Sequence, residues 1–437
     1  MTTVEDPDQE NLDEGAAKRK DRLSFANDLF WSLCFDGFSV IANVVAFWLL
    51  SKNLAPAGYG AYIGLFGIVG PLGGLAWAGV GLAALQRIVR DEHDPVKVAR
   101  AMLGQGMALA LGGTLVAITI ARFAVRTLSL FEISSIVFAE LMALTIVMIS
   151  SFILQGVKGV PAASRLRLVV LVIRVVVVVT LFFTDRLTIA ALGVSTSILF
   201  SLLSVWVLMR SLPAVGLPVL PGGFGKDDSK IALSFSVPLV GSSLQLDGDK
   251  TVLNAYGMED VAGIYGAAFR VINMAYTPIR ALQSAMHNRM LPHDASDHGL
   301  HVRRAKRFAW MNIITIVPIG VILFFAVDLF EPIIGEDFAE SAPIARWLLI
   351  FLPIKAVSSV PLAGLLGLGR TTTRAWVMGI AATISLGLYI VLIPSLSWVG
   401  AVIGTVVGET VLLILGVERL VTWQRRSDAG DDLVTTT

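Results

Sequence analysis

The chain has 437 residues, of which 55% are apolar and 15% charged, and its mean hydropathy is +0.76. A water-soluble fold cannot bury that much apolar surface, so the composition excludes a soluble protein and predicts one that crosses a membrane many times. The formal net charge of +1 carries no information about partners, and no nucleic-acid partner is expected. Cys34 is the single cysteine, which excludes an internal disulfide and a cysteine metal site.

Polar segments flank the apolar part of the chain. Residues 1–25 are acidic and then basic, and we expect them to form a disordered tail. The first apolar stretch follows the basic cluster Lys18–Arg22, but it is too long for a signal peptide and has no small-residue cleavage site. It is therefore expected to remain as the first membrane helix. Residues 423–437 are polar and are expected to form a second tail.

Between these tails, apolar stretches recur at close to the roughly 20 residues that an α-helix needs to cross a bilayer. The sequence therefore predicts an all-α membrane protein with about twelve transmembrane helices. The spans are expected near 28–50, 58–84, 98–120, 134–156, 166–184, 188–209, 231–255, 260–287, 307–328, 342–367, 374–394 and 398–420.

A Pro- and Gly-rich segment at 211–230 divides these spans into six and six. We expect an N-lobe at 26–210 and a C-lobe at 231–422, joined by this cytoplasmic linker. Leu54–Gly60 and Met258–Gly266 are weakly alike and lead into the second span of each half. Paired lobes with a site between them are typical of carriers.

The orientation follows from the distribution of Lys and Arg. With the N-terminus in the cytoplasm, most of the 34 basic residues fall on the cytoplasmic side. We therefore expect a multi-pass protein of the cytoplasmic (inner) membrane with both termini in the cytoplasm.

Polar residues interrupt the eighth span at positions that share one helix face. Arg270, Asn273, Thr277, Arg280, Ser284 and His287 advance by three or four residues. Placing Arg at mid-membrane costs about 3 kcal/mol even on insertion scales, so such a stripe should face a wet cavity. The alternative is snorkelling of a long side chain to the interface, which suits Arg280 better than Arg270 because Arg270 lies deeper.

The seventh span carries a similar polar face that includes Asp247, Lys250 and Asn254. Asp247 and Lys250 are three residues apart, so they can pair on the helix, while Asp249 is expected to point elsewhere. The pair either holds two helices together or contacts a substrate or ion.

Isolated charges in other spans are further candidates. Asp36 lies well inside the first span, where a carboxylate either carries a proton or forms a structural hydrogen bond. Arg174 lies in a Val-rich helix and needs a partner or a cavity, and Glu140 is one candidate partner. Lys355, after Pro353 in the tenth span, is similar to Arg174.

Other chemistry is not indicated by the sequence. His293, His298 and His301, with Asp294 and Asp297, have the side chains of metal ligands but are expected in a solvated cytoplasmic loop, so no metal is predicted. No P-loop or catalytic triad spacing occurs. We expect a transporter without a cofactor rather than an enzyme.

Four segments carry a resemblance to a known family. They are Leu54–Tyr62 (LAPAGYGAY), Ala232–Leu239 (ALSFSVPL), Asp249–Leu253 (DKTVL) and Gly263–Arg270 (GIYGAAFR). In these segments and in its twelve-span plan, the chain resembles the polysaccharide or oligosaccharide flippases (Wzx-type) of the multidrug/oligosaccharidyl-lipid/polysaccharide exporter superfamily.

The resemblance implies a V-shaped pair of six-helix lobes that moves a lipid-linked oligosaccharide, a polyprenyl diphosphate sugar, to the outer leaflet by alternating access for cell-envelope polysaccharide assembly. It implies that cavity arginines bind the diphosphate, which points to Arg270 and Arg280, with Lys250, Asn273, Arg174 and Lys355 as further substrate-binding candidates. Peptidoglycan-precursor flippases of this superfamily concentrate arginines in the first helices. This chain has none inside its first two predicted spans, which disfavours that assignment.

Energy is hypothesised to come from a proton or sodium gradient through Asp36, Asp249 or Asp247. A polysaccharide polymerase or glycosyltransferases are candidate protein partners, beside the polyprenyl-linked saccharide and the lipid bilayer.

Two other functions are weighed against the flippase. A cation-coupled multidrug antiporter of the same superfamily would need a cavity dominated by acids, whereas here acids and bases are mixed. A membrane glycan polymerase or ligase would need large outer segments, and the predicted outer loops 121–133 and 329–341 are short.

Overall fold

The computed structural model describes residues 7–217, 220–280, 282–283, 300–329, 335–368 and 370–428. Over these ranges every regular element is helical and no strand occurs. The predicted all-α class is confirmed.

The N-terminal half contains long helices, some of which continue into short π-helical or 3-10 stretches that are labelled η. Its elements are α1 (Pro7–Gly73), η1 (Gly74–Ala78), α2 (Gly79–Val89), α3 (Pro95–Ala124), α4 (Leu130–Val137), η2 (Phe138–Ala143), α5 (Leu144–Lys158), α6 (Val160–Phe183), α7 (Ile189–Trp206), η3 (Val207–Ser211) and η4 (Pro213–Val215).

The C-terminal half is also helical throughout its described residues. Its elements are α8 (Lys226–Ala255), α9 (Glu259–Ala275), α11 (Leu300–Ala326), η5 (Val327–Leu329), η6 (Glu336–Phe338), α13 (Ser341–Leu348), α14 (Phe351–Gly367), α15 (Thr371–Leu396) and α16 (Trp398–Asp428).

The helix α1 reverses direction at Ala55 and so forms two of the predicted spans. Ala55 has φ 53° and ψ 173°, outside the helical region, and Pro56 follows it. The rings of Phe47 and Tyr59 are 5.6 Å apart. Twelve residues of straight helix would separate these residues by about 18 Å, so the two segments lie side by side.

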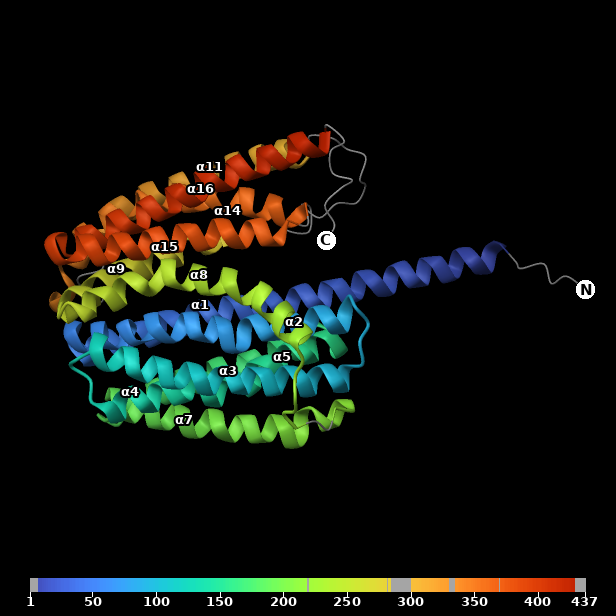
Figure 1. Cartoon of the computed structure of the whole chain (residues 1–437), viewed down its shortest axis with the longest axis horizontal. Helices are drawn as coiled ribbons and strands as arrows, with labels where there is room; N and C mark the ends of the chain where they lie inside the picture. The colour runs from blue at the N-terminus through green and yellow to red at the C-terminus, as the bar shows by residue number, and fades with distance from the viewer. Residues whose placement is uncertain are drawn as a thin grey trace, which may run out of the picture.

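The N-terminal tail differs from the prediction. Residues 7–25 were expected to be disordered, but they continue α1 as a helix that protrudes from the bundle (Figure 1). Ala16, Ala17 and the Lys and Arg residues after them are strong helix formers, and an existing helix extends at a low cost per residue. Residues 1–6 lie outside the described part.

Two other predicted spans are broken. The tenth consists of α13 and α14, which meet at a bend of 49°; Pro353, the third residue of α14, has no backbone N–H to donate to the preceding turn. The eighth ends its regular helix at Ala275, and a turn at Tyr276 precedes a short helical segment at 277–280. Ser284 and His287 of the predicted polar stripe lie outside the described residues.

The helices cross a membrane many times. Eight helical runs in the described part are long and apolar enough to span a bilayer, and nine are if the bent pair counts as one. The helices α8 and α9 are not among them, because polar residues lower the hydropathy of α8 and the regular helix of α9 has only 17 residues. Both lie between the two halves (Figure 1), where such residues need not meet lipid.

The helices form two lobes, each with its own large apolar cluster, and a smaller cluster that includes Phe47, Val178 and Ala267 joins them. The N-lobe core joins residues of α2, α3, α5, α6 and α7, and the C-lobe core joins residues of α8, α9, α14, α15 and α16. In Figure 1 the N-terminal half forms the lower layer and the C-terminal half the upper layer, with α1, α8 and α9 between them. The two-lobe architecture is therefore confirmed.

The two ends of the bundle are distinct. We call the end where the chain reverses at Ala55 and Gly257 the hairpin end, and the end where α1 begins and α16 ends the terminal end (Figure 1).

At the hairpin end the lobes touch through their backbones. A Cβ atom built on Gly60 would lie 1.9 Å from the carbonyl oxygen of Glu259, and one on Gly263 would lie 2.0 Å from that of Pro56. Asn254 donates a hydrogen bond of 2.9 Å to the Gly60 carbonyl oxygen. Only glycine permits so close an approach, so α1 and α9 close this end of the bundle.

Candidate functional site

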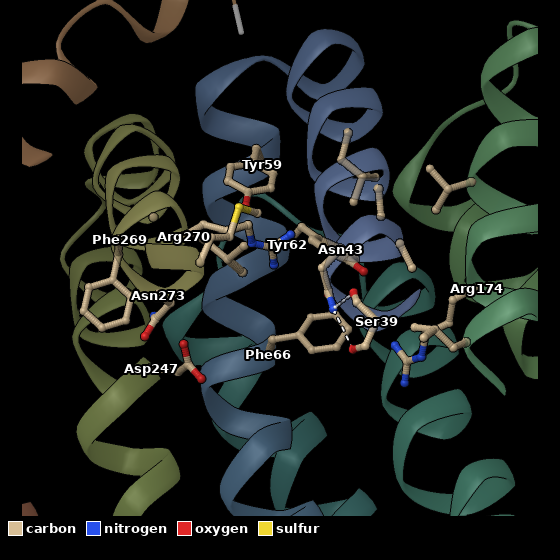
Figure 2. Close-up of a pocket in the computed structure, with 18 of the residues that line it drawn as sticks. Ser39, Asn43, Tyr59, Tyr62, Phe66, Arg174, Asp247, Phe269, Arg270 and Asn273 are labelled. Atoms are coloured by element: carbon tan, nitrogen blue, oxygen red, sulfur yellow. Dashed lines mark hydrogen bonds between the residues drawn. The ribbon is translucent and has the colours of Figure 1, made fainter. Parts of the chain in front are cut away.

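A cavity of about 490 Å³ lies between the lobes, and side chains from α1, η2, α6, α8 and α9 line it (Figure 2). Tyr59 and Leu50 line the part nearest the hairpin end, and Ser39 and Arg280 line the part farthest from it. A pocket of this size with convergent polar groups is the usual form of a small-molecule or headgroup site.

The C-lobe wall of this cavity carries two arginines. The Arg270 guanidinium lies 5.5 Å from the ring centre of Phe47 and 5.9 Å from that of Tyr59. Arg280 donates a hydrogen bond of 2.9 Å to the Thr277 hydroxyl. Within the described ranges neither arginine forms an ion pair, so their charge remains available to an anion.

Lys250 lies beside these arginines at the centre of a charged cluster. Its Nζ is 3.0 Å from Asp247 Oδ1 and 3.1 Å from Asp249 Oδ1, and it lies 4.0 Å from the ring centre of Phe269. Asp249 is fully buried and accepts a hydrogen bond of 2.6 Å from the Tyr265 hydroxyl. The predicted Asp247–Lys250 pair is present.

Asp249 was expected to point away from this pair, but it also contacts Lys250. Adjacent helix positions differ by about 100°, yet the long lysine side chain bends back toward its neighbour. Asp247 differs from Asp249 in that 45% of its side chain is exposed. Asp247 therefore faces the cavity, and Asp249 serves as the buried counter-ion of Lys250.

The N-lobe wall carries one ion pair and two aromatic rings. Arg174 Nη2 lies 2.6 Å from Glu140 Oε2, and Glu140 lies in the π-helical turn η2 that interrupts α4 and α5. The rings of Tyr62 and Phe66 are 4.8 Å apart. Glu140 is thus the partner that Arg174 was expected to need.

Lys355 lies behind the C-lobe wall rather than in it. Its Nζ is 3.3 Å from Asn273 Oδ1, and its ammonium lies 4.8 Å from the ring centre of Phe351. Asn273 lines the cavity, so Lys355 contacts a lining residue without lining the cavity itself.

The structure therefore brings most of the predicted site residues to one cavity. Arg270, Arg280, Lys250, Asn273, Arg174 and Asp247 all line it, whereas Lys355 and Asp249 lie behind it. The side chain of Asp36 lies outside the described residues, as does the loop that contains His293, His298 and His301. Among the residues that are described, no group of acidic, His and Cys side chains is arranged to hold a metal ion.

Sequence reasoning missed the aromatic residues of the cavity, namely Tyr59, Tyr62, Phe66 and Phe269. A signal was present for two of them. Gly60, Gly64 and Gly67 share one face of the second segment of α1 and pack against α8 and α9. Tyr62 and Phe66 share the opposite face, where two aromatic rings between lobes indicate a binding surface.

Several solved structures of membrane transporters have a similar fold. The chain resembles a lipid II flippase, MurJ, in an inward closed conformation, with a TM-score of 0.68, 12% identity and coverage of 91% of this chain and 90% of that one. It also resembles the MATE multidrug transporter DinF-BH, with a TM-score of 0.64, 14% identity and coverage of 93% and 96%.

A third similar structure is an inward-facing multidrug resistance MATE family transporter of the MOP superfamily, with a TM-score of 0.63, 16% identity and coverage of 89% and 96%. No curated protein sequence matches the chain. The fold is that of the exporter superfamily to which these transporters belong, as the resemblance in the sequence implied.

The family follows from the sequence itself. Residues 25–282 match the family described as polysaccharide biosynthesis protein. The match covers more than half of the chain and includes the helices that line the cavity. The chain belongs to this family.

Proposed function

We propose that this protein is a flippase that moves a polyprenyl diphosphate-linked oligosaccharide from the inner to the outer leaflet of the cytoplasmic membrane for cell-envelope polysaccharide assembly. The observation that carries the proposal is the pair Arg270 and Arg280, which face the cavity between the lobes without an ion-pair partner in the described part of the chain. A diphosphate requires charge-assisted hydrogen bonds of the kind that arginine supplies.

The position of the cavity supports the same proposal. The headgroup of a lipid-linked saccharide cannot cross hydrocarbon uncovered, because its charges and hydroxyls would lose their water. A polar chamber between two lobes that opens to one side at a time avoids that cost. With both termini in the cytoplasm, as the distribution of basic residues predicts, the closed hairpin end faces outward and the cavity loads from the cytoplasmic side.

The energy source and protein partners belong to the proposal as well. We propose coupling to a proton or sodium gradient, for which Asp247 is the best-placed acid because its carboxylate reaches both Lys250 and the cavity. Glycosyltransferases would supply the lipid-linked saccharide, and a polymerase would consume it.

The coupling predicts that transport of the saccharide into vesicles ceases when both the proton and the sodium gradient are collapsed. Unchanged transport would exclude the coupling.

The main test is reconstitution of the full-length protein into vesicles with a polyprenyl diphosphate saccharide, followed by a leaflet-accessibility assay. Arg270→Ala should reduce flipping by about a hundredfold, because one buried charge-assisted contact of a few kcal/mol is lost. Arg270→Lys should keep part of the activity, because it keeps the charge but not the planar donor fork.

The matched control is Arg126→Ala, which removes an exposed arginine that lies between α3 and α4 and donates a hydrogen bond to Phe123. This variant should move the lipid-linked saccharide at the wild-type rate. Full activity of Arg270→Ala would refute the proposal. A multidrug antiporter would instead export organic cations from the same vesicles, and a polymerase would lengthen the glycan.

A further inference from the structure

The cavity is divided by charge into two unlike walls. From α8, α9 and the short helical segment at 277–280 it receives Lys250, Arg270 and Arg280, against Asp247 as the single acid among the described lining residues of these elements. From α1, η2 and α6, its only charged lining residues in the described part are Arg174 and Glu140, which pair with each other. The C-lobe wall is therefore cationic, and the described side chains of the N-lobe wall carry no net charge.

We propose that the N-lobe wall is a glycan subsite that selects an uncharged sugar, while the C-lobe wall holds the phosphates. This inference rests on the proposed function and assigns the two parts of one headgroup to opposite walls. Negative charge concentrates in the diphosphate, so it favours the wall with unpaired arginines. With the diphosphate on the C-lobe wall, the sugar attached to it contacts the N-lobe wall.

The groups on the N-lobe wall suit sugar hydroxyls. An arginine has five N–H donors, and only one of those of Arg174 is bonded to Glu140. Glu140 in turn keeps a second carboxylate oxygen, Oε1, as an acceptor. The pair therefore offers both donors and acceptors, as a sugar hydroxyl requires.

The aromatic rings supply the apolar part of the subsite. Tyr62 and Phe66 are one helical turn apart on α1, are partly exposed, and both line the cavity. Figure 2 shows them between Arg270 on one side and Arg174 on the other. Aromatic faces bind apolar C–H surfaces, and a pyranose ring presents such a surface between its hydroxyls.

Glu140 gives this wall its specificity. It is 8% exposed and neutralises Arg174 at 2.6 Å, so the carboxylate of an acidic sugar would gain little from Arg174 and would be repelled by Glu140. Exclusion by a like charge in a partly dehydrated site is an effective means of discrimination.

The test measures binding of three probes to the full-length protein in lipid nanodiscs. The probes share a short polyprenyl diphosphate and carry no sugar, a neutral hexose or the corresponding hexuronate. We expect the hexose probe to bind about tenfold more tightly than the hexuronate probe. Glu140→Gln keeps a hydrogen-bond acceptor for Arg174 but removes the negative charge, so it should reduce this preference to about threefold or less.

A second variant tests the rings. Tyr62→Ala should abolish the advantage of the hexose probe over the sugar-free probe, and Tyr62→Phe should keep most of it. The control Tyr256→Ala removes an exposed tyrosine on the hairpin end, which donates a hydrogen bond to Ile390, and should leave all three affinities unchanged.

The outcomes separate the two proposals. The glycan subsite would be overturned if the wild type bound the hexose and hexuronate probes equally, or if Tyr62→Ala kept the full advantage of the hexose probe. In either case, binding of the sugar-free probe would still support the flippase. Failure of the sugar-free probe to bind would overturn the proposed function and this subsite with it.

Discussion

Gly263→Ala is expected to reduce flipping by about tenfold or more, although the substitution adds a single methyl group. The new Cβ would lie 2.0 Å from the Pro56 carbonyl oxygen and 2.8 Å from its carbonyl carbon. These are backbone atoms that no change of rotamer can move, so α1 and α9 must separate. Because this contact closes the hairpin end, the variant cannot adopt the state that loads from the opposite end.

The measurement combines transport with accessibility. Cys34→Ser removes the single cysteine, and Ala267→Cys then places a thiol at a fully buried position of α9 beneath the closed end. A membrane-impermeant thiol reagent should label this cysteine slowly in the otherwise unchanged protein and rapidly when Gly263→Ala is added.

The control is Gly387→Ala in α15, where an added Cβ meets no atom within 4 Å. It should alter neither flipping nor labelling. Normal flipping by Gly263→Ala, together with slow labelling of the cysteine, would show that the glycine contact does not close the hairpin end.

The sequence predicts the fold well because membrane spans depend on local composition. A run of apolar residues identifies a helix whatever its neighbours are, and a polar stripe such as Arg270, Asn273 and Arg280 shows which helices face inward. The described members of this stripe, Arg270, Asn273, Thr277 and Arg280, all line the cavity.

Other features depend on contacts that a single sequence does not specify. The pairing of Arg174 with Glu140 joins residues 34 positions apart, and sequence spacing gave it no preference over other partners. Asp249 and Lys250 are adjacent in the chain, so helix periodicity assigned them to different faces, whereas the flexible lysine side chain brings them into contact. Periodicity predicts where a Cβ atom points but not where a long side chain ends.

Lys250→Met is expected to lower stability by about 3–5 kcal/mol, the usual cost of removing one partner from a buried ion pair. The ammonium is the positive charge between Asp247 and Asp249, and Asp249 has no solvent exposure. Without Lys250, only the Tyr265 hydroxyl and a backbone N–H would remain to stabilise the buried Asp249 carboxylate. Thermal unfolding of the purified protein in detergent, followed at a fixed scan rate, should show an apparent midpoint lowered by several degrees.

A double-mutant cycle on Lys250 and Asp249 identifies the cause of the lost stability. Lys250→Met combined with Asp249→Asn removes both charges, keeps a partner for Tyr265 and lets the methionine pack against Phe269, so most of the lost stability should return. Lys97→Met, at an exposed position of α3, should leave the midpoint unchanged. If the double variant is no more stable than Lys250→Met, the loss arises from packing of the lysine stem rather than from the uncompensated charge of Asp249.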